Sequence, residues 1–260
     1  MHNNLTLVDT HCHLDFQVFD EDRDWIIKQC LEQDITAIVV PGVCQKDWRR
    51  LLAICSENQS LFPALGLHPC FIQDHHSSDL DKLAQLCDAQ SLVAIGEIGL
   101  DFYRSDLDRD EQKLYFSEQL QIALQYQLPV LIHARKSHDE VIRYLKASPA
   151  IKGIIHAYSG SYEQAKEYLK LGFKLGFGGA FSYPKATRLR SLVSKLPLDS
   201  WVLETDAPDM SPFEHHGERN SPHYLVEIAQ TFISLCDGEA KDDIILNQLH
   251  QNTQAVFPLL

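Results

Sequence analysis

Short apolar runs alternate along the chain with longer stretches in which apolar residues recur at helical spacing. Each run is apolar at consecutive positions, as expected of parallel strands covered by helices on both faces. In order, the predicted strands are 5–10, 35–42, 61–69, 92–100, 129–135, 152–160, 172–179 and 200–208. Eight β-then-α units within 260 residues, without a linker, predict an α/β fold of the TIM-type (β/α)8 barrel class. We expect one domain spanning 1–260; a doubly wound open sheet is the alternative.

The stretches between these runs carry signals for helix starts. Ser137-x-x-Glu140 and Ser161-x-x-Gln164 both resemble capping boxes, and each comes directly after a predicted strand. The acidic residues within 108–111 put negative charge at the first turn of another predicted helix, where the helix dipole favours it.

The net charge of the chain bears on which classes of macromolecule it can bind. The net charge is −13, from 23 basic and 36 acidic side chains. This balance disfavours coating of duplex DNA by charge alone, because non-specific affinity comes from neutralised phosphates. It does not exclude an enzyme whose site is locally positive, since bound metal ions can invert the local charge.

The cysteines and the chain's hydropathy indicate a cytoplasmic protein. There are seven cysteines, at positions 12, 30, 44, 55, 70, 87 and 236. Their number is odd and no pair has C-x-x-C spacing, so we expect reduced thiols and no disulfide framework. No secretion signal is recognised at the N-terminus and no run of about 18 apolar residues could span a membrane.

Ionisable residues recur where the predicted strands end. Barrel enzymes place their chemistry at these carboxyl ends, on the loops of one face. In chain order the residues are Asp9, His11, His13, His68, Glu97, Asp101, His133, Arg135, His156, Glu204 and Asp206. A polar group inside an apolar barrel costs free energy unless it is paired or bound to metal. Convergence from several strands therefore predicts a metal site.

The donor types indicate which metals and how many. The six predicted ligands are His11, His13, Glu97, His133, His156 and Asp206. Nitrogen-rich donors suit Zn²⁺, Mn²⁺, Fe²⁺ or Ni²⁺, and six ligands exceed what one catalytic zinc takes. Two ions about 3.5–4 Å apart can share an activated hydroxide. Glu97 is the natural bridge, because a carboxylate has two oxygens, and Asp206 can take the proton of the attacking water as general base.

Taken singly, these motifs also have structural explanations. An isolated H-x-H is often a surface or capping pair, and His68 before a proline is an ordinary loop histidine. Gly176, Gly178 and Gly179 do not form a dinucleotide fingerprint, and we expect them to permit close approach of backbone. The convergence of residues, more than any one motif, supports the metal site.

The motifs in combination resemble the TatD-type metal-dependent hydrolases or deoxyribonucleases, within the wider amidohydrolase-like barrels. The matching segments are DTHCHLDF, GLHP, GEIGLDF, PVLIHAR, HAYSG, ETDAP and RNSP, in order from about residue 8 to 222. GEIGLDF followed by ETDAP about a hundred residues later is the most specific combination.

This resemblance implies a division of the ligands. His11 and His13 would bind one ion together with Asp206; His133 and His156 would hold the other, and Glu97 would bridge both. The resemblance also implies a nuclease that removes nucleotides from nucleic-acid ends with two divalent metal ions, zinc, manganese or magnesium being the candidates. Asp9 is expected to orient a histidine ligand rather than to bind metal itself.

Two positions depart from the family pattern. HAYSG has Tyr158 where members usually carry phenylalanine, a mild change beside the substrate. Glu218 precedes Arg219 where a basic residue is more usual, which weighs against tight polynucleotide binding.

Phosphate needs donors besides the metals. Arg135 is the best candidate for a bidentate contact, and Ser159 lies at a strand-to-helix junction whose backbone N–H groups suit an anion. Arg219 could reach the substrate from the last long loop, and His68 could lie near a phosphate or the leaving group.

Three functions remain open on sequence alone. The leading hypothesis is a hydrolase that cuts phosphodiester bonds of DNA ends. A small-molecule amidohydrolase, lactonase or phosphoesterase could use the same binuclear site, and the acidic composition is compatible with it. A non-catalytic metal-binding protein is the third, which the complete ligand set disfavours. Nucleic acid is the expected partner, with no membrane association, no obligate protein partner and a monomeric state.

Overall fold

The computed structural model describes residues 6–236 and 241–258. In these ranges eight parallel strands follow one another in chain order, from β1 to β8. Their bounds are β1 Leu7–Asp9, β2 Ile35–Pro41, β3 Leu61–Leu65, β4 Ala94–Asp101, β5 Val130–Arg135, β6 Gly153–Ile155, β7 Lys174–Phe177 and β8 Trp201–Leu203. All eight predicted strands are confirmed, most of them shorter than their apolar runs; Leu5, where the first run starts, lies outside the described residues.

A helix follows every strand along the chain. The bounds are α1 Arg23–Glu32, α2 Trp48–Glu57, α3 Ser77–Ala89, α4 Arg109–Tyr126, α5 His138–Ala147, α6 Tyr162–Lys170, α7 Thr187–Lys195, α8 Leu225–Leu235 and α9 Asp242–Val256. A doubly wound sheet would reverse its strand order at a switch point. The order here follows the chain without reversal, so the predicted TIM-type (β/α)8 barrel is confirmed.

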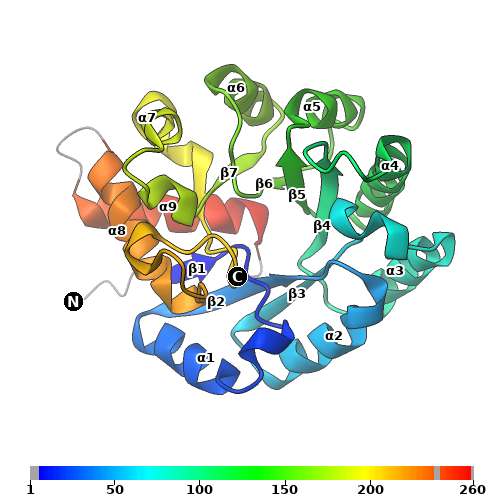
Figure 1. The fold of residues 1–260 in the computed structure, drawn as a ribbon, viewed down its shortest axis with the longest axis horizontal. Coiled ribbons are helices and arrows are strands. Elements are labelled where there is room, and N and C mark those ends of the chain that lie inside the picture. The colour runs from blue at the N-terminus through cyan, green and yellow to red at the C-terminus, as the bar shows by residue number, and fades with distance from the viewer. Residues whose placement is uncertain (1–5, 237–240, 259–260) are drawn as a thin grey trace. The chain divides into compact units, whose positions relative to one another are not determined.

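The chain divides into two compact units, and the first is Pro41–Phe173. It contains β3 to β6, whose strands lie inside helices α2 to α6 (Figure 1). All eight residues of β4 are buried, as a strand covered on both faces requires. The pairing of β4 with β5 sets Gly99 beside His133 and Asp101 beside Arg135. This register brings the polar ends of two strands together.

The second unit is formed by Met1–Val40 and Lys174–Leu260. Of these segments the structure describes residues 6–40, 174–236 and 241–258. The unit pairs β1 with β2 and β7 with β8; α8 and α9 pack against β8, and α7 packs against α8. Figure 1 shows α7, α8 and α9 on the outside of this unit. Its core is aromatic: the rings of Phe177, Phe181, Trp201 and Phe232 lie against one another, with centroids 4.2 to 6.2 Å apart. The prediction of a single domain over 1–260 stays a prediction.

The predicted helix starts are partly confirmed. Ser161 and Gln164 form the expected capping box at α6, with Ser161 Oγ accepting from Gln164 N and Gln164 Oε1 accepting from Ser161 N. The capping box at Ser137 is wrong, because its hydroxyl donates at 2.6 Å to the carbonyl of Leu100 at the end of β4. Asp108 caps α4 by accepting from two backbone N–H groups of the first turn.

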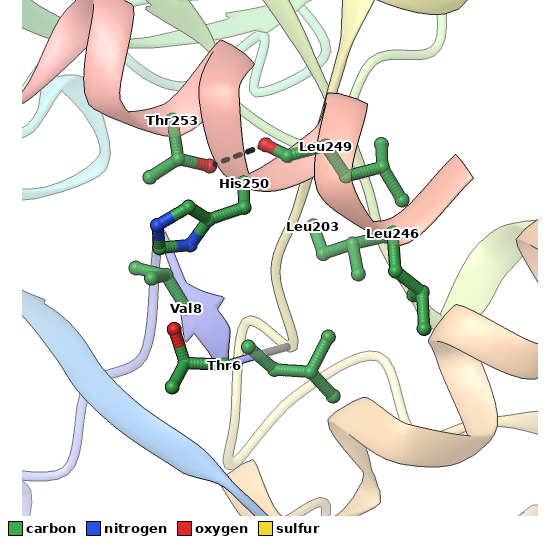
Figure 2. A pocket seen from close by; sticks show the side chains of 8 residues that line it. Thr6, Val8, Leu203, Leu246, Leu249, His250 and Thr253 are labelled. Atoms are coloured by element: carbon green, nitrogen blue, oxygen red, sulfur yellow. Dashed lines mark hydrogen bonds between the residues drawn. The ribbon is translucent and has the colours of Figure 1, made fainter. Parts of the chain in front are cut away.

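A small recess lies where α9 packs on β1 and β8 (Figure 2). Thr6, Val8 and Leu203 line it from the strand side, and Leu246 and His250 line it from α9. Its volume of about 10 Å³ has room for at most one water molecule. It is a packing gap between α9 and the two strands, and we assign no ligand to it.

The expected thiol state agrees with the structure. None of the seven cysteines, all of which lie in the described ranges, forms a disulfide, and four of them are buried. In the described part of the chain, no helix combines the length and apolar character needed to cross a membrane.

Candidate metal centre

His11, His13 and Asp206 form one group of potential metal ligands. Nε2 of His11 lies 3.3 Å from Nε2 of His13, and Oδ1 of Asp206 lies 3.8 and 3.7 Å from these two nitrogens. His11 is fully buried, and the Asp206 side chain is 15% exposed. Two imidazoles and a carboxylate pointing at one place form a donor set typical of zinc and similar ions. The predicted association of these three residues is present.

Backbone hydrogen bonds hold this group together. Beyond β1 and β8 the two segments continue to pair, because Asp206 N donates to His11 O at 2.8 Å and His13 N donates to Ala207 O at 2.8 Å. Asp206 has a φ of 58°, in the left-handed region that aspartate tolerates better than most residues. The ligands therefore lie on a fixed backbone frame.

The side chain of Asp9 stabilises the same backbone segments through hydrogen bonds. Its Oδ1 accepts from the backbone N–H groups of His11 and Thr205, at 3.2 and 3.0 Å, and its Oδ2 accepts from the Thr205 hydroxyl. Complete burial raises the pKa of Asp9 to about 7, although these hydrogen bonds lower it. These contacts tie the end of β1 to the segment after β8. They hold the backbone of His11, whereas the prediction was that Asp9 orients a histidine ring, and that prediction stays untested.

Glu97, His133 and His156 are the ligands predicted for the other ion. Oε1 of Glu97 lies 3.1 Å from Nδ1 of His133, and ligand atoms of Glu97 and His156 lie within 4.8 Å of each other. Glu97 is 2% exposed and His156 is 5% exposed. The electrostatic influence of His156 on His133 also indicates that the two rings are near each other. The structure brings all three together.

Asp101 is a further residue of this group to which the sequence assigned no role. Its Oδ2 lies 3.1 Å from Nε2 of His133, and its Oδ1 accepts from the backbone N–H groups of Tyr103 and Arg104. Strand alternation puts residues 97 and 101 on one face of β4, which is the signal that could have identified it. A carboxylate on the second nitrogen of a histidine ligand fixes the ring and raises its basicity.

Two carboxylates therefore enclose the ring of His133. Burial lowers its pKa, but hydrogen bonds to Asp101 and Glu97 outweigh this and raise the pKa of His133 to about 9. Burial raises the pKa of Asp101, but His133 and the backbone donors outweigh this and hold it below its usual range. A cation at this place, whether a proton on imidazole or a metal, is strongly favoured.

His68 and Cys70 also lie against these residues. Nε2 of His68 lies 3.2 Å from Oε1 of Glu97, and its Nδ1 accepts from Cys70 N at 3.1 Å. Cys70 Sγ donates to Asp101 Oδ2 at 3.4 Å, and burial raises the pKa of this thiol to about 12. His68 was predicted to contact substrate; the structure places it on the Glu97 carboxylate, and a substrate contact stays a prediction.

The predicted phosphate contacts occupy different environments. Arg135 and Ser159 are exposed, Arg135 at the end of β5 and Ser159 just before α6. Arg219 instead pairs with Asp22 through both guanidinium NH2 groups and donates to the Val18 carbonyl at 2.6 Å. A phosphate would have to compete with Asp22 for Arg219, which makes it the weakest of the three candidates.

Asn220 and the glycines singled out in the sequence contact the segment that follows β8. Asn220 of the RNSP segment is buried and donates to the carbonyls of Thr205 and Asp209, which fixes the loop that carries Asp206. Gly179 has the carbonyl of Met210 directly against it, so the predicted close approach of backbone is confirmed there. At Gly176 the close neighbour is the carboxylate of buried Glu204, a side chain where backbone was expected.

The donor groups fit divalent metal. Each of the two predicted sets combines imidazole nitrogens with carboxylate oxygen, is largely buried, and lies at the carboxyl ends of strands. Buried histidines and carboxylates gathered this closely are costly without a bound cation. The fold and these groups define a barrel protein equipped to bind metal.

Comparison with known proteins gives the family. The family model for TatD related DNase matches residues 8–258, so the chain belongs to this family. It is 37% identical over 254 residues to the uncharacterized metal-dependent hydrolase YjjV of Escherichia coli (strain K12), covering 96% of this chain and 97% of YjjV. It is 40% identical over 242 residues to an uncharacterized metal-dependent hydrolase of Haemophilus influenzae (strain ATCC 51907 / DSM 11121 / KW20 / Rd), covering 88% of this chain and 90% of that one.

A solved structure supports the same assignment. The crystal structure of YJJV, a TatD homolog from Escherichia coli K12, matches with a TM-score of 0.94 at 34% identity, covering 99% of this chain and all of that one. The chain is therefore a TatD-family metal-dependent hydrolase with a TIM-type barrel fold.

Proposed function

We propose that this protein is a deoxyribonuclease that hydrolyses phosphodiester bonds at DNA ends with two divalent metal ions. The observation that carries the proposal is the pair of donor groups at strand ends, His11–His13–Asp206 and Glu97–His133–His156. Membership of the TatD related DNase family supports the substrate class.

In this proposal the first group holds one ion, the second group holds the other, and Glu97 is the shared ligand that the family resemblance implies. Zinc, manganese and magnesium are the candidate metals. Bound divalent ions would supply Lewis-acid stabilisation of the phosphoryl oxygens and acidify a water molecule. The family pattern has a complete set of ligands in this chain, which argues against a non-catalytic metal-binding protein.

The chain's own side chains have separate tasks in the reaction. Asp206 accepts the proton of the attacking water on its carboxylate, which is still 15% exposed and so within reach of solvent. Arg135 is exposed beside the end of β5 and binds a phosphate oxygen pair of the substrate. Ser159 and the backbone before α6 offer further donors to phosphate. His68 contacts Glu97 Oε1, the same oxygen that His133 approaches, and helps to hold it in position.

The test compares phosphodiester substrates with the small molecules that related barrels hydrolyse. Purified protein is stripped with a chelator, restored with Zn²⁺, Mn²⁺ or Mg²⁺, and assayed on single-stranded oligonucleotides and on a panel of lactones and amides. We expect cleavage of the oligonucleotides from an end, dependent on restored metal. Asp206→Asn should lower kcat by about 10²- to 10⁴-fold, the usual contribution of a general base.

Asp81→Asn is the matched control, since Asp81 is an exposed carboxylate on α3. It should leave kcat within about a factor of two to three, as expected when no group in contact with substrate is changed. If wild type cuts no phosphodiester faster than Asp206→Asn does, the nuclease proposal is wrong. Metal-dependent turnover of a lactone or amide in the same assay would then establish the small-molecule alternative.

A further inference from the structure

The loop after β4 exposes an aromatic ring beside two cations. Tyr103 is 52% exposed, although a tyrosine ring normally buries most of its apolar surface. The Arg135 guanidinium lies 3.9 Å from the centre of this ring, and Lys136 Nζ lies 4.9 Å from it. Both cations come from the end of β5, the strand that carries His133.

These two cations are not neutralised by acidic partners. Among residues 6–236 and 241–258, Arg135 and Lys136 have no carboxylate within ion-pair distance. The neighbouring Arg104 differs, because it pairs with Asp106 through two hydrogen bonds of 2.9 and 2.7 Å. In a protein of net charge −13, an exposed ring beside two cations without carboxylate partners is a local positive site.

Asp101 connects this site to the metal ligands. One of its oxygens accepts from Tyr103 N at 2.9 Å and from Arg104 N, and the other lies 3.1 Å from His133 Nε2. The β4–β5 register also sets Asp101 beside Arg135. The backbone at Tyr103 is therefore held, through one buried carboxylate, near a residue that the proposed function assigns to a metal ion.

We propose that Tyr103, Arg135 and Lys136 form a nucleotide-binding platform on which one base of single-stranded DNA stacks while its phosphate pairs with the two cations. This inference rests on the proposed function and adds to it a contact for one base of the substrate. An exposed aromatic ring flanked by cations is the arrangement that binds single strands without reading their sequence. In a duplex the bases are paired and stacked on each other, so a base reaches the ring only at an unpaired end.

The experiment measures binding separately from cleavage. Fluorescence anisotropy with chelated, metal-free protein follows the binding of a labelled single-stranded oligonucleotide and of an abasic one of the same length and charge. Tyr103→Ala should weaken binding of the oligonucleotide with bases by about five- to a hundredfold, the range for loss of one stacking contact, and leave the abasic one unchanged. Tyr103→Phe keeps the ring and should keep the affinity.

Arg135→Gln and Lys136→Gln test the phosphate contact. Each should weaken both oligonucleotides and reduce the slope of log affinity against log salt by about one, as expected for one lost phosphate contact. Tyr144→Ala is the matched control, because Tyr144 also lies under an arginine, with Arg143 4.6 Å from its ring centre, but is carried by α5. It should change neither affinity.

The outcomes separate this inference from the proposed function. Equal losses on the two oligonucleotides in Tyr103→Ala, or no loss at all, would overturn the platform, even if cleavage depends on Asp206. A base-dependent loss in Tyr103→Ala that is absent in Tyr103→Phe supports it, even if no phosphodiester is cut. Thermal melting of each variant identifies losses that come from unfolding, and if Tyr103→Ala does not fold, Tyr103→Leu, which also lacks the aromatic ring, replaces it in the same comparison.

Discussion

Oδ2 of Asp101 lies 3.1 Å from Nε2 of His133, while Nδ1 of the same ring faces Glu97 at the same distance. A histidine has one nitrogen for a metal and one for a hydrogen bond, and the hydrogen bond decides which is which. A neutral His133 that donates from Nε2 to Asp101 would have the lone pair of Nδ1 directed toward Glu97, where a bound metal ion would replace the proton. Asp101, to which the sequence assigned no role, is thus the residue that would select the tautomer of His133.

Asp101→Asn should weaken metal binding without removing any predicted ligand. An amide can still hold the ring, but it lacks the charge that raises the basicity of His133, so we expect a 10- to 100-fold loss in metal affinity, the usual cost of such a change. Competition with a chromophoric chelator measures this directly. Asp106→Asn, on the exposed side chain that pairs with Arg104, is the control and should leave affinity unchanged. Unchanged affinity in Asp101→Asn would remove its positioning role.

Most of the fold could be predicted from sequence because burial on both faces leaves a simple signature. β4 and β5 are nearly continuous apolar runs, and a helical stretch follows each strand, so the barrel class follows from the order of elements. The group His11–His13–Asp206 was also predictable, since these polar residues end strands and have no apolar role there.

The remaining features depend on partners that are distant in sequence. Ser137 has a capping sequence, yet its hydroxyl donates to Leu100, which only the β4–β5 register brings near. Arg219 is a cation in a motif, yet its guanidinium forms an ion pair with Asp22, which lies nearly 200 residues earlier in the chain. Such local signals compete with long-range contacts that no sequence pattern records.

Glu97→Gln should lose bound metal and hydrolysis together. The variant keeps the size of the side chain but removes the charge at the carboxylate that His68 and His133 both approach within 3.2 Å. We expect metal content after dialysis to fall by at least one ion per chain and activity to fall with it, because a neutral amide is a poor substitute for the carboxylate that is proposed to be shared by both ions. Elemental analysis provides the measurement, and Glu214→Gln, on an exposed residue, is the control. Substantial activity in Glu97→Gln would contradict the bridging assignment.

Gly176→Ala should destabilise the fold through Glu204. A Cβ at residue 176 would lie 2.3 Å from Oε2 of Glu204, whereas at Gly178 the nearest atom is an ordinary 3.4 Å away. We expect Gly176→Ala to lower the free energy of unfolding by about 1–3 kcal/mol, the usual cost of overpacking, and Gly178→Ala to cost less. Urea denaturation measures both.

A double variant isolates the cause of that loss. In a Glu204→Ala background the clashing carboxylate is gone, so adding Gly176→Ala should cost clearly less than it does in wild type. Strictly additive losses would show that the alanine is excluded by the backbone of β7 itself.

His75 should make the protein lose stability in mild acid. Its ring is buried, with Nε2 donating to the His68 carbonyl at 3.0 Å. Burial lowers the pKa of His75 below its ordinary value of 6.5, although that carbonyl and nearby acids raise it. The unfolded chain therefore takes up a proton near pH 6.5 that the native state resists. This contribution to stability is present above 6.5 and falls as the pH drops below it, by at most about 1.4 kcal/mol per pH unit.

His75→Gln separates this residue from the other histidines of the chain. Glutamine can donate to the His68 carbonyl and does not titrate, so the variant should lose less stability than wild type between about pH 7 and about pH 5. Urea denaturation across this range gives the free energy of unfolding at each pH for both proteins. Parallel curves for wild type and His75→Gln would mean that His75 titrates alike in both states.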